Sequence, residues 1–193
     1  MSTGLFGGTF DPIHTAHLII GEEAVRFLGL DRLVFLPAAR PPHKSDEDIT
    51  PLEHRLEMVR LAIADNPRFE VSDAEAALEG RSYTIETVRH FRRRLGESEE
   101  LHFIMGADSL SQFLAWKDPD DLLTECGFAA VPRPGVDLDE ADPGVRSRVR
   151  ILDAPLLEIS SSDIRERART GKSIRYLVPA AVAAYISEKN LYT

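Results

Sequence analysis

The segment GGTFDPIHTAH, residues 7 to 17, constrains the fold more strongly than any other part of the chain. The residues that lead into it, TGLFGG, are apolar and end in glycine, which is typical of a buried parallel strand. The residues that follow it carry apolar side chains at near-helical spacing and reach Gly29, a common helix stop. The segment therefore predicts a strand, a tight turn and a helix, with Thr15 as the N-cap residue. The apolar helix positions are Leu18, Ile19, Ala24, Val25 and Leu28.

The same turn carries two imidazoles, His14 just before the first helical turn and His17 within it. Backbone N–H groups at the start of a helix have no carbonyl partner inside the helix, so they favour an anion such as phosphate. Gly7 and Gly8 would let the backbone approach that ligand closely. A metal site is a weaker interpretation, because no cysteine or further histidine lies nearby in the sequence. The plain alternative is a tight turn with two incidental histidines.

Two other phosphate-binding patterns can be excluded on spacing. The turn lacks the G-x-G-x-x-G pattern of dinucleotide-binding proteins, because its glycines are Gly4, Gly7 and Gly8. The triplet 171–173, GKS, imitates the end of a P-loop, but Glu166 stands where that pattern requires glycine.

The rest of the chain alternates predicted strands and helices, which is typical of an α/β protein. Strands are expected at 3–7, 32–37, 68–72, 101–106, 127–131 and 149–153, and helices at 16–28, 51–65, 83–95, 161–170 and 179–190, with short helices between 107 and 124 and a helical turn at 143–148. We expect a Rossmann-like parallel sheet with helices on both faces and ligands beyond the carboxyl ends of its strands. With 43% apolar residues in a chain of 193, residues 1–193 are expected to form a single domain.

Charge and composition exclude several classes of function. A net charge of −9 argues against a general nucleic-acid-binding protein, which would need a basic face. Cys126 is the only cysteine, so no internal disulfide can form, and its apolar surroundings in the sequence predict a buried side chain. The sequence shows no signal peptide and no apolar stretch of membrane-spanning length, which predicts a cytoplasmic protein that does not bind a membrane. The oligomeric state is open, and a homo-oligomer is compatible with the sequence.

A second motif, ISSSDIR at 159–165, places three serines before a predicted helix and Arg165 within its first turns. Hydroxyls, backbone N–H groups and a guanidinium can converge there on one phosphate. Serines in this position also cap a helix without any ligand, and for this motif alone that alternative carries equal weight. Residues 163–175 contain five basic and two acidic side chains, a local positive charge suited to a compact polyanion.

With both motifs in place, the chain resembles the bacterial nicotinate mononucleotide adenylyltransferases of the HxGH nucleotidyltransferase superfamily over nearly its whole length. The segments that carry the resemblance are GGTFDPIHTAH, LPAARPPHK at 36–44, RSYTIETV at 81–88, IMGADSL at 104–110, FLAWKD at 113–118, VPRPG at 131–135, ISSSDIR and SIRYLVPAAVAAYI at 173–186. Two positions depart from the family pattern. Ser162 replaces the usual threonine and keeps the hydroxyl, whereas Ala16 replaces the usual glycine and adds a methyl group beside the predicted phosphate site.

The resemblance implies transfer of the AMP part of ATP to nicotinate mononucleotide, giving nicotinate adenine dinucleotide and pyrophosphate. It implies catalytic roles for His17, His14 and Arg165, with His17 at the α-phosphate, and helices from about residue 160 that complete the ATP site. Mg²⁺ is expected as the cofactor, held mainly by the phosphates of ATP and not by a protein metal site. The ATP-binding residues that the resemblance implies are Gly7, Gly8, Thr9, Phe10, His14, His17, Gly106, Asp108, Ile159, Ser160, Ser161, Ser162 and Arg165.

For the acceptor, the resemblance implies binding by Lys44, Thr84, Asp108 and Trp116. Trp116 would stack on the pyridine ring, although a core aromatic is the ordinary alternative. Backbone N–H groups near Thr84 would receive the nicotinate carboxylate, and Asp108 would accept hydrogen bonds from a ribose unless it only caps a helix. Lys44 would neutralise phosphate unless it is a mobile surface lysine.

Two rival interpretations remain open. Phosphopantetheine adenylyltransferases share a similar histidine turn and a serine-rich late helix, but their chains are usually shorter, and LPAARPPHK and FLAWKD favour the pyridine nucleotide enzyme. A DNA-binding regulator would use the helices at 161–170 and 179–190 as a helix-turn-helix. Against it, Val178, Val182 and Ile186 give the last helix an apolar face suited to packing.

Overall fold

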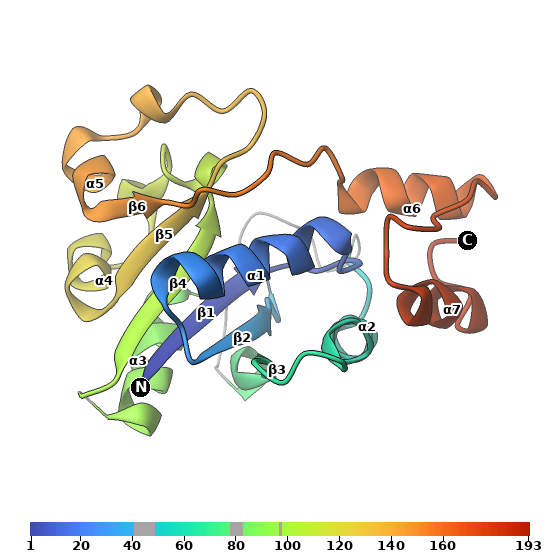
Figure 1. Ribbon diagram of the computed structural model, residues 1–193, viewed down its shortest axis with the longest axis horizontal. Coiled ribbons are helices and arrows are strands. Elements are labelled where there is room, and N and C mark those ends of the chain that lie inside the picture. The colour runs from blue at the N-terminus through green and yellow to red at the C-terminus, as the bar shows by residue number, and fades with distance from the viewer. Residues whose placement is uncertain (41–48, 78–82, 97) are drawn as a thin grey trace.

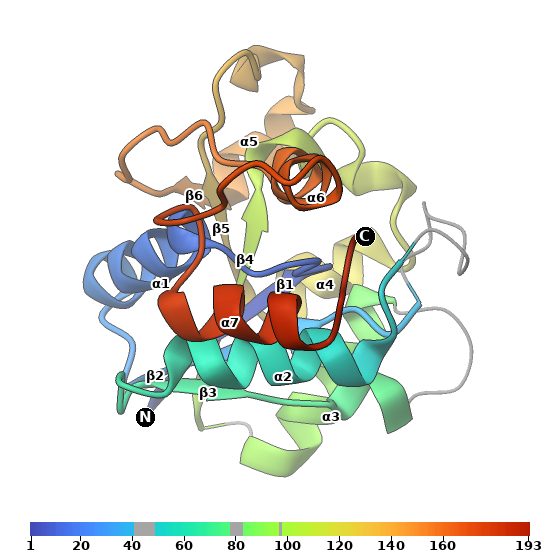
Figure 2. The ribbon, with the colours of Figure 1, turned by 90° about the vertical axis from the view of Figure 1, so that its right-hand side faces the viewer.

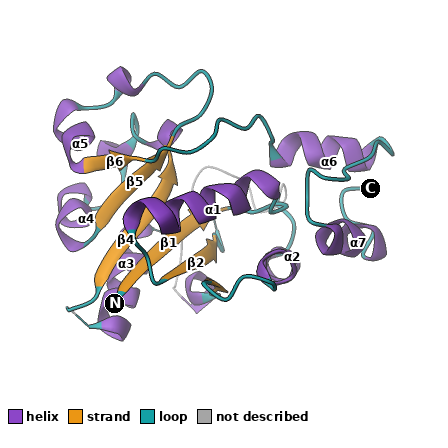
Figure 3. Cartoon of the chain, in the orientation of Figure 1, coloured by secondary structure: helices purple, strands orange, loops and turns teal. Residues whose placement is uncertain are grey.

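The computed structural model describes residues 1–40, 49–77, 83–96 and 98–193. At its centre lies a six-stranded sheet in the order β3-β2-β1-β4-β5-β6, in which each neighbouring pair of strands is parallel (Figure 1, Figure 3). The strands are β1 (Ser2–Gly8), β2 (Arg32–Pro37), β3 (Phe69–Val71), β4 (Glu100–Gly106), β5 (Gly127–Val131) and β6 (Val149–Ile151). The predicted parallel α/β architecture is confirmed.

Helices cover both faces of this sheet, because successive residues of a strand point to opposite faces and both sets are apolar here. Phe6 and Ile104 belong to a buried cluster that includes side chains of α1 (Thr15–Leu28), α2 (Leu52–Ile63), α6 (Ser161–Arg169) and α7 (Ala180–Glu188). Their neighbours Leu5 and Phe103 belong to a second cluster with α3 (Thr84–Leu95), α4 (Pro119–Glu125) and α5 (Pro143–Arg148).

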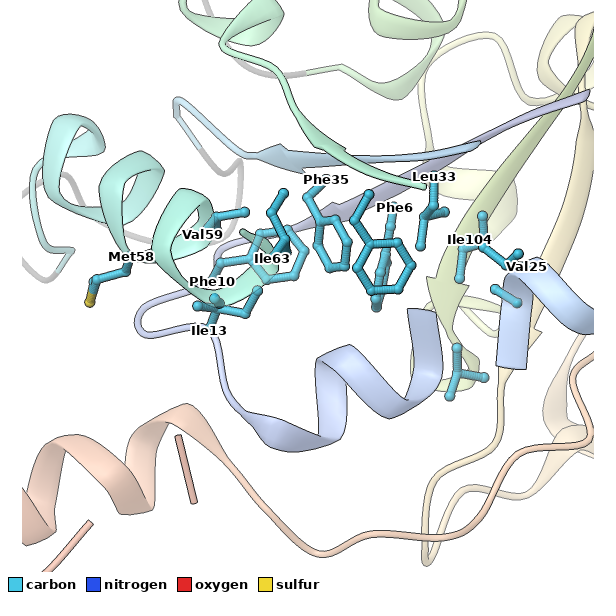
Figure 4. Packing of buried hydrophobic residues seen from close by; sticks show 14 of the residues in the cluster. Phe6, Phe10, Ile13, Val25, Leu33, Phe35, Met58, Val59, Ile63 and Ile104 are labelled. Atoms are coloured by element: carbon cyan, nitrogen blue, oxygen red, sulfur yellow. The ribbon is translucent and has the colours of Figure 1, made fainter. Parts of the chain in front are cut away.

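The first cluster extends into the turn that follows β1. Figure 4 shows the rings of Phe6, Phe10 and Phe35 gathered beside the side chains of α2. The Phe10 ring lies edge-on to Phe6 with 5.5 Å between ring centroids, and Phe6 lies 5.4 Å from Phe35. Phe10 is 2% exposed although it belongs to a turn, so the core itself fixes the path of the chain after β1.

The order of the strands reverses between β1 and β4. From β1 the chain proceeds outward through β2 to β3, and it then returns to the other side of β1 to build β4, β5 and β6. The connections leave in opposite directions at this point, which opens a crevice beyond the carboxyl ends of β1 and β4.

The two C-terminal helices return to this crevice and to α2. Figure 2 shows α7 lying along α2, with α6 above both helices in that view. Val182 and Ile186 of α7 are buried in the first cluster, and the Nδ1 atom of His54 in α2 lies 2.9 Å from the Tyr185 hydroxyl. The apolar face of the last helix is therefore occupied by packing, as its sequence predicts, and the helix-turn-helix alternative loses its support.

Predicted and observed elements differ mainly at their ends. Two short 3₁₀ helices, η2 (Ala74–Ala77) and η5 (Leu138–Glu140), were not predicted, and the region 107–124 divides into η3 (Ala107–Ser109), η4 (Phe113–Ala115) and α4. Over the ranges that the structure describes, none of the helices combines the length and apolar character needed to cross a membrane.

Candidate active site

A cleft of about 690 Å³ lies beyond the carboxyl ends of β1, β4 and β5, where α1 and α6 begin. The histidine turn, which runs from the end of β1 to the start of α1 and carries His14 and His17, forms part of its lining. The serine motif at 159–165, Ala16 and Arg133 contribute as well. The residues predicted to bind ATP all line this cleft: Gly7, Gly8, Thr9, Phe10, His14, His17, Gly106, Asp108, Ile159, Ser160, Ser161, Ser162 and Arg165.

The histidine turn begins helix α1 one residue earlier than predicted, because His14 and not Thr15 is the N-cap residue. Thr15 is instead used to bind the segment before α7. Its backbone N–H donates to the carbonyl of Leu177 at 2.8 Å, and its hydroxyl donates to the carbonyl of Tyr176 at 2.9 Å. The tertiary contact with a distant segment thus outweighs the capping preference of threonine.

The glycines of the turn make room for aromatic rings as much as for a ligand. Phe10 has a φ of 49°, an uncommon backbone conformation for a residue with a side chain, and its ring folds back over Gly8. A Cβ atom on Gly8 would lie 2.9 Å from the ring of Phe10, and one on Gly7 would lie 2.7 Å from the ring of Phe103. Larger residues at either position would displace the core packing that holds the turn.

The imidazoles of His14 and His17 stack on each other with 3.7 Å between ring centroids. The backbone N–H of His14 donates to Nδ1 of His17 at 3.2 Å, so in the neutral ring of His17 the proton is carried by Nε2. Burial lowers the pKa of His14 to about 4, with Arg133 adding to the effect. Burial, His14 and Arg133 together hold the pKa of His17 well below its ordinary value. Both rings are therefore neutral hydrogen-bonding groups at pH 7 in the free protein.

Arg133, which follows β5, is a cleft cation that our sequence analysis missed. Its Nε atom lies 3.6 Å from Oδ1 of Asp108, and more than half of each side chain is exposed. Asp108 lies inside η3, whose N-cap residue is Gly106, so the helix-capping interpretation of Asp108 is wrong. The signal that could have found Arg133 is its position two residues after a predicted strand, at the edge where parallel sheets bind ligands.

Helix α6 is bound to the histidine turn through its first residues. Ser160 is the N-cap and accepts a hydrogen bond from the N–H of Asp163 at 3.1 Å. The helix begins at Ser161, as the predicted range 161–170 has it, so of the three serines of the motif only Ser160 precedes it. The Ser161 hydroxyl donates to the carbonyl of Pro12 at 2.9 Å. The helix start thus forms one wall of the cleft.

Arg165 completes this connection. Its guanidinium donates to the backbone carbonyl of Asp11 at 2.8 Å and to the Ser162 hydroxyl at 3.3 Å. The other arginines of α6 point elsewhere: Arg167 pairs with Asp163 at 2.7 Å, and Arg169 pairs with Glu166 at 2.7 Å on the helix surface. Of the positive charge in this helix, Arg165 is the part that faces the cleft.

Comparison with known proteins agrees with this geometry. The family model described as cytidylyltransferase-like matches residues 5–167, which include the end of β1, the histidine turn and the start of α6. The chain belongs to the cytidylyltransferase-like family.

Relatives of this cytidylyltransferase-like protein are similar over almost their entire lengths. A protein from Moorella thermoacetica, described as a probable nicotinate-nucleotide adenylyltransferase, is 47% identical over 196 residues, covering 98% of this chain and 90% of the relative. A protein of the same description from Geobacter metallireducens is 46% identical over 214 residues, covering 100% of this chain and 99% of the relative.

Among solved structures, the Plasmodium falciparum nicotinic acid mononucleotide adenylyltransferase complexed with NaAD superposes with a TM-score of 0.81. The match covers 99% of this chain and 97% of that chain, at 20% sequence identity. At this identity the likeness establishes a shared fold and topology.

The residues predicted to bind the acceptor are less closely grouped in this cytidylyltransferase-like chain. Thr84 is the first residue of α3, and Trp116 follows η4 with its ring stacked on Phe113 at 5.1 Å between centroids. Trp116 is partly exposed, so it is neither a core aromatic nor a free loop side chain. Neither Thr84 nor Trp116 is among the described residues that line the 690 Å³ cleft, and Lys44 lies outside the described residues.

Proposed function

We propose that this protein is a nicotinate-nucleotide adenylyltransferase, which transfers the AMP part of ATP to nicotinate mononucleotide. The observation that carries the proposal is the convergence of two stacked neutral imidazoles, two helix N-termini and two arginines on one cleft. This arrangement has the chemistry of a polyphosphate site, and the relatives of nearly equal length provide the second support.

The reaction requires no side-chain nucleophile, because the phosphate of the acceptor already carries an anionic oxygen. That oxygen attacks the α-phosphorus of ATP, a new P–O bond forms, and the bond to the pyrophosphate oxygen breaks with its electron pair. Catalysis then depends on alignment of the two substrates and on stabilisation of the charge that develops on the phosphate oxygens. The cleft supplies donors for both tasks.

The hydrogen bond between His14 and His17 supports His17 as the proposed donor at the α-phosphate. Since Nδ1 of His17 accepts from the backbone, Nε2 of the same ring carries the proton and can donate it to a phosphate oxygen. His14, Ser162 and Arg165 would then bind the remaining ATP phosphates, with Arg133 adding positive charge near the two imidazoles. Neutral imidazoles suit this role because they donate without having to change their protonation state.

The acceptor would be bound by residues on the side of α3. Backbone N–H groups in the first turn of α3, near Thr84, would bind the nicotinate carboxylate, and the partly exposed ring of Trp116 would stack on the pyridine ring. Asp108, which pairs with Arg133, would accept a hydrogen bond from a ribose hydroxyl. Lys44 is retained as a candidate for the acceptor phosphate from the sequence.

Mg²⁺ fits this cleft as an ion that arrives with ATP. The described residues contain no group of three or more histidine, cysteine or acidic side chains with the geometry of a metal cage. The carboxylate of Asp11 is buried and bonded to Tyr192, and that of Asp108 is paired with Arg133. The ion would neutralise charge on the triphosphate, while the helix starts and arginines of the chain bind the oxygens that it leaves free.

The test is release of pyrophosphate from MgATP with different acceptors. We expect nicotinate mononucleotide to be the best acceptor, because an amide in place of its carboxylate reverses half of the hydrogen-bonding polarity at the α3 start. Each buried partner left unpaired by the wrong acceptor costs on the order of 1 to 3 kcal/mol. Equal turnover of nicotinamide mononucleotide would contradict the proposed specificity, and a preference for phosphopantetheine would contradict the proposed enzyme.

A further inference from the structure

Arg55, in the first turns of α2, is a charged side chain that is only 1% exposed. Its Nε atom donates to the carbonyl of Thr50 at 2.8 Å, and its Nη1 atom donates to the carbonyls of Thr9 at 2.9 Å and of Ala38 at 2.8 Å. Burial lowers the pKa of this guanidinium, while the nearby acidic groups raise it, and these are Asp11, Tyr192, Glu75 and Glu53. A buried cation is costly, so its retention calls for an explanation beyond packing.

The docking of α2 does not account for this cation. The helix is already fixed on the sheet by apolar side chains in its middle and last turns, among them Met58, Val59 and Ile63. Arg55 lies at the opposite end of the helix and donates to three separate segments of backbone. One is the turn after β1, one is the end of β2, and one precedes α2 itself.

Together with two further hydrogen bonds, these contacts surround the start of the histidine turn. The N–H of Ala38 donates to the carbonyl of Gly8 at 2.9 Å, which extends the pairing of β1 with β2 by one bond. On the far side of the turn, Oδ2 of Asp11 accepts from the N–H of Thr50 at 3.2 Å. Arg55 donates to Thr9 in the turn and to both flanking segments, at Ala38 and at Thr50. The backbone path of Thr9 and Phe10 is therefore fixed by the end of β2, by the start of α2 and by Arg55.

These hydrogen bonds affect His17 through the ring of Phe10. Fixing the carbonyl of Thr9 fixes the peptide that leads into Phe10, whose φ of 49° needs support from its surroundings. The ring of Phe10 then lies edge-on to the imidazole of His17, with 4.9 Å between centroids and 75° between planes. A shift of the Thr9 carbonyl would therefore change the position of the His17 ring.

We infer that Arg55 is a positioning residue for adenylyl transfer, which holds the imidazole of His17 at the α-phosphate through the Thr9 carbonyl and the Phe10 ring. The inference rests on the proposed function. Arginine suits the task because its planar fork carries several donors in fixed directions, whereas a lysine ammonium is a flexible point charge.

The experiment compares Arg55→Lys and Arg55→Met with Arg60→Met, a matched control on the same helix whose exposed side chain pairs with Glu57 at 3.3 Å. Steady-state kinetics with MgATP and nicotinate mononucleotide would be combined with NMR titration of isotopically labelled His17. We expect Arg55→Met to lower kcat by roughly 10- to 100-fold, since a small misplacement of a catalytic group costs that much. The KM of the acceptor should change less than kcat, because Thr84 and Trp116, two of its proposed binding residues, belong to elements that Arg55 does not contact.

The titration separates positioning from a general loss of structure. When the Phe10 ring no longer covers His17, water reaches the imidazole and its pKa should rise toward its ordinary value, with Arg55→Lys intermediate in both readouts. Arg60→Met should match the wild type. Should Arg55→Met fail to fold, Phe10→Leu can be used instead, because it removes the aromatic ring that contacts His17 and leaves Arg55 in place. It should reproduce the lower kcat and the higher pKa of His17.

Folded Arg55 variants with kcat within twofold of the wild type would overturn the inference, as would a lower kcat with an unchanged His17 titration. Because the NMR readout needs no turnover, it tests the positioning even if nicotinate mononucleotide proves to be the wrong acceptor. Failure of the proposed function and failure of this inference are thus distinguishable.

Discussion

The backbone N–H of His14 donates to Nδ1 of His17 at 3.2 Å, across the three residues that begin helix α1. This bond turns Nε2, the protonated nitrogen of the neutral ring, away from the helix backbone. Because the ring is neutral in the free protein, it can bind an anionic oxygen without first taking up a proton. The N-cap of one helix thereby prepares a donor for phosphate chemistry.

The depressed pKa of His14 predicts a loss of stability in acid. Its ordinary pKa of 6.5 applies to the unfolded chain and its folded pKa is about 4, so between these values the unfolded state binds more protons. Stability is therefore complete above pH 6.5 and falls as the pH drops toward 4, by on the order of 2 to 3 kcal/mol for this group. Urea unfolding at pH 7 and pH 4.5 should show a smaller acid loss in His14→Gln than in the wild type or in His90→Gln. An equal loss in all three would contradict the folded-state burial of His14.

Arg133→Gln tests the arginine that follows β5 and lines the cleft. We expect kcat/KM for ATP to fall by roughly tenfold, since a charge-assisted contact contributes about 1.5 kcal/mol or more to the binding of phosphate. Thermal stability should change little, because the pair with Asp108 is exposed. Arg169→Gln removes a comparable exposed ion pair outside the cleft and should leave the kinetics unchanged. Identical kinetics of the two variants would exclude Arg133 from the site.

The sequence predicts the fold well where hydrophobic patterns are strong. The bounds of β2 and β5 agree with their predictions, because each is a short apolar run with clear breaks on both sides. The helix predicted at 161–170 begins at Ser161, with Ser160 as its N-cap, because a serine hydroxyl satisfies a backbone N–H of the first turn. Short 3₁₀ helices such as Ala74–Ala77 leave too few residues for a periodic pattern.

The sequence reveals the site only in part, for a related reason. His14, His17 and Arg165 occur in motifs, so their convergence on one cleft could be expected from the topology of a parallel sheet. Arg55 and Arg133 are single cations in a helix and a loop, and alone they cannot be distinguished from solvated surface charges. Their roles depend on the carbonyls and carboxylate that the fold places around them.

Trp116→Ala should raise the KM of the acceptor while leaving that of ATP nearly unchanged, because stacking acts on the pyridine ring in the ground state and the transition state alike. The ring also stacks on the buried Phe113, so the free energy of unfolding should fall by about 1 kcal/mol. Steady-state kinetics with each substrate varied in turn and a urea titration provide both values. A large loss of stability without a selective effect on the acceptor would make Trp116 a structural aromatic only.

Ala16→Gly tests the departure from the family pattern. Ala16 is 3% exposed and its position in the first turn of α1 is compatible with helical backbone angles, so its methyl group is already accommodated beside the cleft. We expect kcat to change by less than about fivefold and stability to fall by about 1 kcal/mol, the usual cost of glycine in a helix. A hundredfold gain in turnover would show that the methyl group obstructs the phosphates of the natural substrate.

The most direct test of the account is single-turnover adenylyl transfer in His17→Ala and His17→Gln. Alanine removes the donor and should lower the rate by roughly 10²- to 10³-fold, the loss that accompanies removal of one preorganised donor to a transition state. Glutamine places an amide N–H near the former Nε2 and should recover part of that loss. Near-normal rates in folded His17→Ala would contradict adenylyl transfer at this site, and the histidine turn would then have to be interpreted as structural.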